Sequence, residues 1–306
     1  MSDRTALDRV VRAAGGADVL DRLAGLPGAD LITLLLGVMR RRAGQLAPAD
    51  VLRRYREDRF VAPAAVPFDR LRATEDRLIS LLPNDFEMLT LAPVVPLGTH
   101  SVLGSVHQDK VVATVRGSEV AADATNGLAL VAADRRRTAL QADPRSADVV
   151  RLATLQRVVR AQRFAGAGRF AHFGLLGMVS AGRDTGDLAF ERRYVVEHVR
   201  FLMTTLLTMG GAELRLTVAQ PRLAPVADAV RDDLAGLTGV TVVDDPDRPA
   251  GLGYYAGLCF KAFVVRDDVR TEIADGGLIN WTQSLLGNRK ERLVISGAGI
   301  EGLASL

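Results

Sequence analysis

The sequence lacks the residues from which disulfide frameworks and metal clusters are built. Cys259 is the only cysteine among 306 residues, so no internal disulfide can form, and no Cys/His spacing is typical of a structural metal site. Cys259 lies within an apolar alternation, where we expect a buried small hydrophobic residue rather than a nucleophile. We therefore expect no metal site.

Long apolar runs and a leader are missing as well. The longest apolar run, LITLLLGVM at Leu31–Met39, is far shorter than the roughly 20 residues that a membrane-spanning helix needs. The N-terminus does not show the basic, apolar and small-residue pattern of a signal peptide. We expect a cytoplasmic protein that makes no contact with a membrane.

A strong net charge is also absent. The 39 basic residues exceed the 36 acidic ones by only three, which is too little to argue for nucleic-acid binding. Lysine is scarce, because only Lys110, Lys261 and Lys290 accompany the many arginines. The hydrophobic content of 48% suffices for a large core, in one large domain or two modest ones.

Apolar residues recur three and four positions apart from about Thr5 to Asp58, in runs that mostly end at Gly or Pro. This pattern predicts a small helical N-terminal unit, residues 1–66, that ends in a linker at Val61–Pro67. Its basic stretches, MRRRAG and LRRYRED, are interpreted as solvated helix surface. A contact with a polyanion or a protein partner is the alternative.

The remaining residues, 67–306, show strand-like and helical runs in alternation. A helix is expected to open at Pro67. Strands are then expected at 86–95, 110–116, 118–124, 171–182, 213–218, 240–245, 251–265 and 292–297, and helices at 126–140, 193–207, 224–237 and 276–287. Few of these runs form strand–helix–strand crossovers, which favours an α+β fold with a mostly antiparallel sheet flanked by helices.

A glycine-rich loop lies between two of these runs, at Arg160–Phe173. It contains Arg160, Arg163 and Arg169, and guanidinium groups on both arms of such a loop can clamp a phosphate. The loop has neither the Walker pattern nor a dinucleotide fingerprint. An ordinary exposed hairpin is the alternative interpretation.

Two further stretches could hold a ligand. Glu119, Asp123, Thr125 and Asn126 lie at a strand-to-helix junction, where a carboxylate can bind an ammonium group, although Thr125 or Asn126 could simply cap the helix. The segment GLGYYAG, Gly251–Gly257, places two tyrosine hydroxyls beside bare backbone that a ligand could approach. A β-bulge or a tight bend is the alternative there.

The order of these stretches resembles the catalytic core of class II aminoacyl-tRNA synthetases, in particular histidyl-tRNA synthetase and its paralogue, the regulatory subunit of ATP phosphoribosyltransferase. The likeness covers about Phe68–Leu306, and its most specific pieces are GLGYYAG and GRFAHF. It implies a class II core at residues 67–306, with a homodimer interface at Phe68–Pro96. It also implies a small amino-acid-like ligand, with ATP and Mg²⁺ as candidate cofactors.

The resemblance also assigns roles to single residues. Arg160 would bind the nucleotide α-phosphate and, with Arg169, would orient it for catalysis. The residues implied in nucleotide binding are Arg160, Arg163, Arg169, Phe170 and Glu301. The amino group of the ligand would be received by Asp123, and the residues implied in ligand binding are Asp123, Thr125, Tyr254, Tyr255, Gly251 and Gly257.

The sequence departs from the family pattern at several of its motifs. Ala250 replaces the arginine that precedes the Gly-Leu segment in histidyl enzymes, Gly253 replaces an aspartate, and Gln162 stands where a glutamate is usual. Gly302 replaces the arginine that grips the triphosphate, a loss worth several kcal/mol of transition-state stabilisation. The cluster Arg289, Lys290 and Arg292 could supply replacement charge or could form a solvated turn.

Two hypotheses of function follow. The first is a catalytically degenerate synthetase paralogue that binds an amino acid or a similar ligand as a regulatory or accessory protein. The second is an ATP-dependent ligase that activates a carboxylate and transfers it to an acceptor other than tRNA. Histidyl enzymes continue into an anticodon-binding domain after the third motif, where this sequence ends, so we do not expect tRNA as a partner.

Overall fold

The computed structural model describes residues 2–16, 18–162, 170–248 and 254–306. The chain divides into two compact units. The first, here called the N-terminal unit, comprises Met1–Ala62 and Ala113–Ser118, and the second, the core unit, comprises Pro63–Val112 and Glu119–Leu306.

The N-terminal unit contains the predicted helices. They are α1 (Ser2–Ala13), α2 (Asp18–Ala24), α3 (Gly28–Ala43) and α4 (Pro48–Glu57). Helix α4 begins with a proline, and the Asp50 carboxylate accepts a hydrogen bond from the backbone N–H of Ala47 at 3.0 Å, which satisfies a donor that the helix itself leaves unpaired.

No single helix in the described part of the chain is both long and apolar enough to cross a membrane. Helices α2 and α3 satisfy that criterion only as a pair, by length and composition, and the chain bends by 120° between them.

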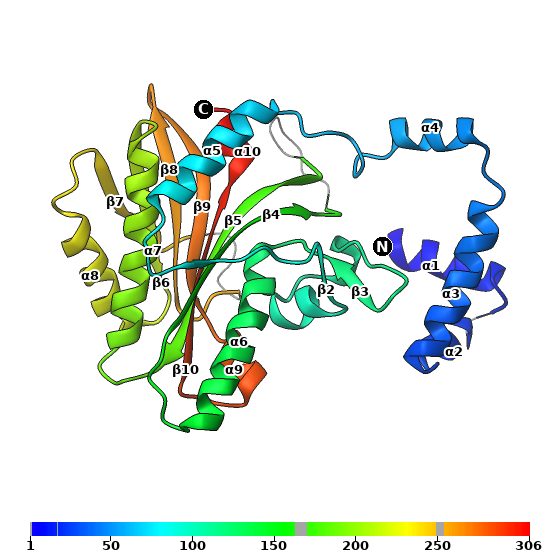
Figure 1. The fold of residues 1–306 in the computed structure, drawn as a ribbon, viewed down its shortest axis with the longest axis horizontal. Helices are drawn as coiled ribbons and strands as arrows, with labels where there is room; N and C mark the ends of the chain where they lie inside the picture. Colours follow the sequence, from blue (N-terminus) through cyan, green and yellow to red (C-terminus); the bar gives the residue numbers. More distant parts are fainter. Residues whose placement is uncertain (1, 17, 163–169, 249–253) are drawn as a thin grey trace. The chain divides into compact units, whose positions relative to one another are not determined.

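The core unit is built on an eight-stranded mixed sheet in the order β1-β4-β5-β10-β9-β8-β6-β7 (Figure 1). The strands are β1 (Glu87–Met88), β4 (Val150–Val159), β5 (His172–Arg183), β6 (Gly211–Val218), β7 (Val240–Asp244), β8 (Leu258–Arg266), β9 (Val269–Ile279) and β10 (Glu291–Gly299). Only β1 with β4 and β6 with β7 pair in parallel. The predicted α+β class with a mostly antiparallel sheet is confirmed.

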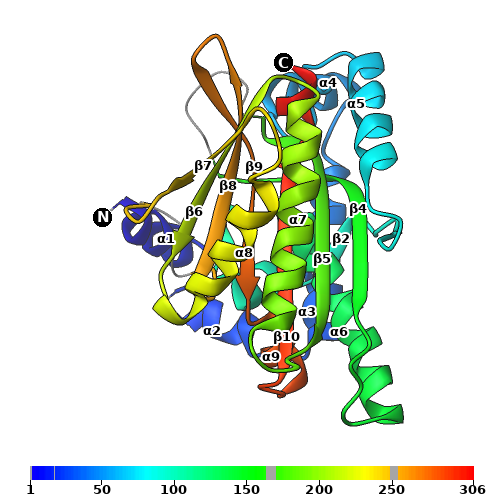
Figure 2. The ribbon, with the colours of Figure 1, turned by 90° about the vertical axis from the view of Figure 1, so that its left-hand side faces the viewer.

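Helices cover both faces of this sheet. Helices α7 (Ala189–Leu207) and α8 (Ala224–Leu234) lie over one face in Figure 2, whereas α6 (Ala124–Ala142) and α9 (Trp281–Leu286) pack on the other, here called the α6 face. Strand β5 serves both layers, because Leu176 and Met178 pack with the α7 side while Val179 and Ala181 pack with the α6 side. This is the alternation expected of a strand buried on both faces.

The core unit also contains shorter elements. They are α5 (Phe68–Leu81), the paired strands β2 (Val94–Pro96) and β3 (Ser118–Val120, whose first residue is counted in the N-terminal unit), the single helical turns η1 (Thr99–Leu103), η2 (Gln108–Lys110) and η3 (Pro221–Leu223), and the final helix α10 (Ile300–Ala304). Helix α5 packs against α10 and α7.

Several predicted elements were wrong in extent. The run 86–95 forms only β1 and the start of β2. The run 110–116 begins at the end of η2 and continues as a bend, a single bridge and a turn rather than as a strand. In the described part of the run 251–265, residues 254–257 form a turn and bends, and the strand begins at Leu258; residues 251–253 lie outside the described residues.

The largest error concerns the predicted helix at 276–287. Its first four residues belong to β9, and the helix spans only Trp281–Leu286. A Cβ atom at Gly276 would lie 2.6 Å from the carbonyl oxygen of Ile295 and 2.5 Å from the Phe260 ring. Gly276 is therefore a requirement of close packing within the sheet, not a helix signal.

Candidate ligand-binding site

A cavity of about 510 Å³ opens on the α6 face of the sheet and is here called the main cavity. Its floor is a row of cross-strand partners, because Lys261 of β8 pairs with Asp275 of β9, which in turn pairs with Gly297 of β10. Residues that face one another across strands point to the same side of the sheet. The pairing register thus places these three positions side by side beneath one opening.

Glycines in this row leave the room for the cavity. Gly297 carries no side chain, and a Cβ atom there would meet nothing closer than 3.6 Å. Its partner Gly177 on β5 lies under the start of α6, where a Cβ atom would come within 2.9 Å of the Ala124 Cβ atom. The helix therefore begins directly on the sheet, beside the empty space above Gly297.

The beginning of α6 brings Asp123 to the wall of the main cavity. One oxygen of Asp123, Oδ1, caps the helix by accepting hydrogen bonds from the N–H and the hydroxyl of Thr125, at 2.9 and 2.7 Å. The other oxygen, Oδ2, lies 3.6 Å from Nη2 of Arg160. The capping group is Asp123 itself, and its second oxygen still faces the cavity across a loose ion pair.

Arg160, at the end of β4, is held by the same junction. Its Nε donates to the carbonyl oxygen of Ala122 at 3.0 Å, and its guanidinium carbon lies 5.0 Å from the centre of the Phe173 ring. Stacking on an aromatic face and a backbone acceptor fix the orientation of a guanidinium group. Arg160 can therefore present its remaining donors to an anionic group in the cavity.

A buried histidine supports this junction from below. The backbone N–H of Ala122 donates to Nε2 of His100 at 3.0 Å, so we assign the proton to Nδ1, which donates to Oδ1 of Asn126 at 2.9 Å. Nδ2 of Asn126 is buried at the cavity wall and has no hydrogen-bond partner among the described residues. An unpaired buried donor is costly, so a ligand acceptor here would relieve that cost.

Glu119 is part of this support rather than of the cavity. Burial would raise its pKa, but hydrogen bonds from the His100 N–H, the Gln108 side chain and the Gly98 N–H together lower the pKa below its usual value. The distances from the carboxylate to these donors are 2.8, 2.8 and 3.1 Å. The Glu119 carboxylate thus holds the chain around η1 through these three hydrogen bonds.

The opposite wall contains Tyr254, Tyr255 and Arg248. The two tyrosine rings meet edge to face, 4.9 Å between centres, and Tyr254 makes a similar contact with Trp281 at 5.5 Å. The Tyr255 hydroxyl donates to Oδ2 of Asp275 at 3.1 Å, and Nη2 of Arg248 lies 3.5 Å from the same oxygen. The tyrosine pair therefore forms a packed side wall that ends at the Asp275 carboxylate.

The ionisation of this wall is strongly perturbed. Burial raises the pKa of Asp275, and the nearby negative charge of Asp123 raises that pKa further, against the opposing effects of Arg248 and Tyr255. Burial, followed by the charges of Asp123 and Asp275, likewise raises the pKa of Tyr254. Strongly shifted groups in a concave site are typical of functional sites.

A second cavity of about 370 Å³ adjoins the first and is here called the adjacent cavity. Arg160, Leu175, Glu272, Asp275 and Gly297 line both cavities. The adjacent cavity is otherwise lined by Phe170, Phe173, Ile273, Ala274, Gly299, Glu301 and Gly302.

The charge of the residues described around the adjacent cavity does not match a triphosphate. Among its described lining residues, Arg160 is the sole cation, against the carboxylates of Glu272, Asp275 and Glu301. Glu301 is itself engaged, because it accepts hydrogen bonds from Arg157 at 2.8 Å and from the Gly174 N–H at 2.6 Å. The described residues therefore do not fit a nucleotide triphosphate well.

The structure brings five predicted ligand or phosphate contacts to the main cavity: Asp123, Thr125, Arg160, Tyr254 and Tyr255. Phe170 and Glu301 line the adjacent cavity. Gly251, Arg163 and Arg169 lie outside the described residues. The roles of all these residues stay predictions.

Gly257 is not among the described residues that line either cavity. Its φ angle is 89°, and a Cβ atom there would lie 2.6 Å from the Gln220 side chain. The glycine is thus explained by a left-handed turn and a close approach.

Arg248 and Asp275 are among the residues of the site that sequence reasoning missed. Arg248 stands two positions before Ala250, where the family arginine is missing, so a displaced guanidinium could have been sought there. Asp275 interrupts an apolar run directly before two glycines, a pattern that indicates a strand facing a cavity as well as a helix start.

Among the residues that the structure describes, no group of three or more Asp, Glu, His or Cys side chains could hold a metal ion.

Neither a protein-family model nor a curated protein sequence matches the chain. Solved structures do match it. The ATP phosphoribosyltransferase regulatory subunit/histidyl-tRNA synthetase of Bacillus halodurans is 13% identical, covers 81% of this chain and 82% of its own length, and superposes with a TM-score of 0.61.

Two histidine–tRNA ligases are similar as well. A ligase subunit of Alicyclobacillus acidocaldarius is 16% identical, with 79% of this chain and 94% of that chain covered and a TM-score of 0.57. The apo histidyl-tRNA synthetase of S. aureus is 15% identical, with 78% of this chain covered and a TM-score of 0.56. The chain spans only 65% of the length of the S. aureus enzyme.

These likenesses establish the fold. The chain has the class II aminoacyl-tRNA synthetase-like fold. Within that fold, it is similar to histidyl-tRNA synthetases and to the regulatory subunit of ATP phosphoribosyltransferase.

Proposed function

We propose that this chain binds a small amino-acid-like metabolite in the main cavity and acts as a regulatory or accessory protein. The observation that carries this proposal is the convergence of Asp123, Arg160 and Tyr254, from three separate parts of the sequence, on one cavity of about 510 Å³. A cavity of this size, with convergent polar groups and shifted pKa values, is typical of a small-molecule site.

The chemistry of the walls suits a zwitterion. Asp123 can receive an ammonium group, and Arg160 can bind a carboxylate through its planar donors. The 3.6 Å between their side chains exceeds the 2.7–2.9 Å of a charge-assisted hydrogen bond. A ligand with both charges would therefore replace one loose contact by two close ones.

The adjacent cavity supports a role without adenylation. Its described residues place Arg160 against three carboxylates, and Gly302 supplies no guanidinium group. Binding of a triphosphate would bring anionic oxygens near these carboxylates, which is unfavourable. We therefore propose that ligand binding persists in a site where nucleotide activation has been lost.

Thermal shift with a panel of amino acids tests the proposal. We expect at least one amino acid to stabilise the protein by mass action, with no pyrophosphate exchange in the presence of ATP and Mg²⁺. Asp123→Ala should abolish the ligand-induced shift. Stabilisation that is unchanged in this variant would reject the placement of the amine.

The alternative function is activation of a carboxylate with ATP, and one observation favours it. Arg160 lines both cavities, so a single guanidinium group could contact a substrate carboxylate and a phosphate on either side. ATP with Mg²⁺ would supply the activating phosphate chemistry. Pyrophosphate exchange above background that disappears in Arg160→Ala would establish this alternative and reject the regulatory role.

We also propose that the chain forms a homodimer through Phe68–Pro96. This segment exposes large apolar side chains, with Phe68 80%, Ile79 41% and Val94 38% exposed. Burial of such residues against a second copy would be favourable. Light scattering should give twice the chain mass for the native protein, and the chain mass for Phe68→Glu. A native monomer would reject the interface.

A further inference from the structure

Asp275 is a carboxylate at the cavity floor that is only partly satisfied. Its Oδ2 accepts the Tyr255 hydroxyl at 3.1 Å and lies 3.5 Å from Arg248, whereas its Oδ1 accepts no hydrogen bond from a described residue. Although it lies deep between strands and tyrosines, the side chain remains 47% exposed to the solvent in the cavity. One oxygen of Asp275 is therefore free to bind a ligand.

The surroundings of Asp275 compensate its charge only in part. The nearest cation, Arg248, is a loose partner at 3.5 Å. Lys261, beside it in the floor, is taken up by Glu272 at 2.8 Å. Asp123 faces the same cavity and repels Asp275, and together they raise the pKa of the buried Tyr254. Lys110, Arg160, Arg248 and Lys261 also line this cavity. Because Lys261 pairs with Glu272 and Arg160 lies beside Asp123, the one ion-pair partner of Asp275 among the described residues is Arg248, at 3.5 Å.

We propose that Asp275 binds a second cationic group, the terminal ammonium of the ligand side chain, so that the main cavity takes a diamino acid. This inference rests on the proposed function, in which Asp123 receives the α-ammonium group and Arg160 the carboxylate. Two ammonium groups match the two carboxylates, which neither a neutral amino acid nor a single amine can do.

The walls between the carboxylates fit an aliphatic spacer. Tyr254 lines the same cavity as Asp123 and Asp275. Its ring packs against Tyr255, whose hydroxyl donates to Asp275 at 3.1 Å. The methylene chain of ornithine or lysine can pack on this ring while its ends bind the carboxylates. A permanently charged ammonium group gains more from an undercompensated carboxylate than a neutral imidazole does.

Calorimetric titration with matched ligands tests the inference. Ornithine and norvaline differ by the terminal amine, as do lysine and norleucine. We expect the diamino acid of the better pair to bind at least tenfold more tightly than its neutral counterpart at pH 7.5. Asp275→Asn should remove this preference, so that the diamino acid and its neutral counterpart bind with similar affinity. A melting curve of the unliganded variant verifies that it is folded.

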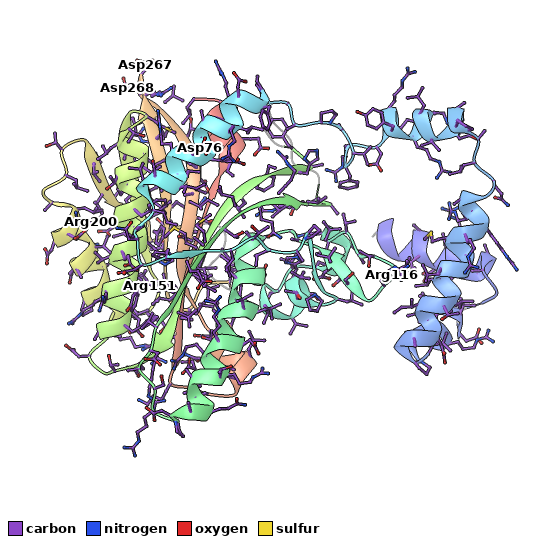
Figure 3. The ribbon with its side chains drawn as sticks, viewed as in Figure 1. Asp76, Arg116, Arg151, Arg200, Asp267 and Asp268 are labelled. Carbon is purple, nitrogen blue, oxygen red and sulfur yellow. The ribbon has the colours of Figure 1, made fainter. Side chains whose placement is uncertain are left out.

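Asp268→Asn is the matched control. It removes one carboxylate from the same β8–β9 hairpin, in the exposed turn that Figure 3 labels, and Asn tolerates the φ angle of 61° found there. The control should keep the full preference for the diamino acid. Loss of the preference in both variants would mean that general charge, not the position of Asp275, sets it.

The remaining outcomes separate the two proposals. Equal binding of norvaline and ornithine, or tighter binding of histidine than of either diamino acid, would overturn the diamino inference but leave amino-acid binding intact. Putrescine lacks the carboxylate of ornithine. If it binds as tightly as ornithine, the cavity does not recognise the ligand carboxylate, and both proposals are overturned. Absence of binding for every amino acid would also overturn both.

Discussion

Arg248 and Asp275 meet in the lining of the main cavity, with Nη2 of the arginine 3.5 Å from Oδ2 of the aspartate. The arginine is only 4% exposed, donates to the carbonyl oxygen of Phe260 at 3.3 Å and lies 5.4 Å from the centre of the Tyr255 ring. Arg248 thereby brings a guanidinium group to the site, whereas Ala250 stands where the resemblance to histidyl-tRNA synthetases implies an arginine. The acid opposite it remains undercompensated, which gives the first prediction.

Asp275→Asn should make the unliganded protein more stable at neutral pH. Because the folded state raises the pKa of Asp275, ionisation of this group disfavours folding at pH values above the raised pKa. The variant should melt about 2 °C higher at pH 7, a modest effect because solvent in the cavity screens the charge.

The pH dependence gives the control for this prediction. Below the pKa of the unfolded state, near 4, Asp275 is protonated in both states and resembles asparagine. The difference between variant and native protein should therefore vanish as the pH falls to that range. A variant that is less stable than the native protein at pH 7 would contradict the prediction. The neighbouring groups that contribute to this pKa are unchanged in the variant; they are Asp123, Arg248, Tyr255 and Glu272.

Gly297→Leu should fill the main cavity without disturbing the sheet. A Cβ atom at Gly297 meets its nearest neighbour at 3.6 Å, which is ordinary contact, whereas one at Gly276 would meet backbone oxygen at 2.6 Å. We expect Gly297→Leu to keep its melting temperature within about 3 °C and to lose all ligand-induced stabilisation. Gly276→Ala, the smaller change, should cost about 1–3 kcal/mol. The two variants are compared by urea unfolding and thermal shift.

The order of motifs predicted one half of the site. Asp123, Arg160 and Tyr254 come from different stretches, and only the resemblance indicated that they meet. The sequence could not predict the floor, because Lys261, Asp275 and Gly297 become neighbours through the registers of β8, β9 and β10.

The fold was likewise predicted in class but not in every strand. The spacing of apolar residues and the Gly and Pro residues between the runs located α6, α7, β5 and β10 well. Strand β9 was missed because its exposed first half is polar, and because Gly276 and Gly277 resemble a helix start rather than a strand. Local pattern cannot distinguish the two, since the reason for these glycines is the approach of β8 and β10.

Glu291→Gln should be strongly destabilising. Glu291 of β10 and Arg136 of α6 are both fully buried, and two parallel hydrogen bonds of 2.8 and 2.9 Å join them. Loss of the carboxylate leaves the Arg136 charge buried without compensation, at a cost of about 3–5 kcal/mol. Urea unfolding measures this cost.

An exposed pair gives the control for that prediction. Arg200, labelled in Figure 3, is 52% exposed in its side chain and binds Asp233 through Nε at 2.8 Å. Asp233→Asn should cost under about 1 kcal/mol, because solvent screens such a pair. Equal costs in the two variants would contradict the view that burial makes the Arg136–Glu291 pair important.

His198 should make the free energy of unfolding decrease as the pH decreases, because its ring is fully buried. Its Nε2 lies 3.0 Å from the Ser180 hydroxyl and its Nδ1 2.8 Å from the Ser296 hydroxyl, and complete burial lowers its pKa to about 3. Above pH 6.5 the ring is neutral in both states. Between pH 6.5 and about 3 only the unfolded state binds the proton, so stability decreases by about 2 kcal/mol at pH 5.

His198→Gln should lack this part of the decrease. Urea unfolding at pH 7.5 and 5.0 should thus show a smaller pH effect in the variant, whatever its absolute stability, since all carboxylates titrate alike in both proteins. An identical decrease in the two proteins would place the responsible groups elsewhere.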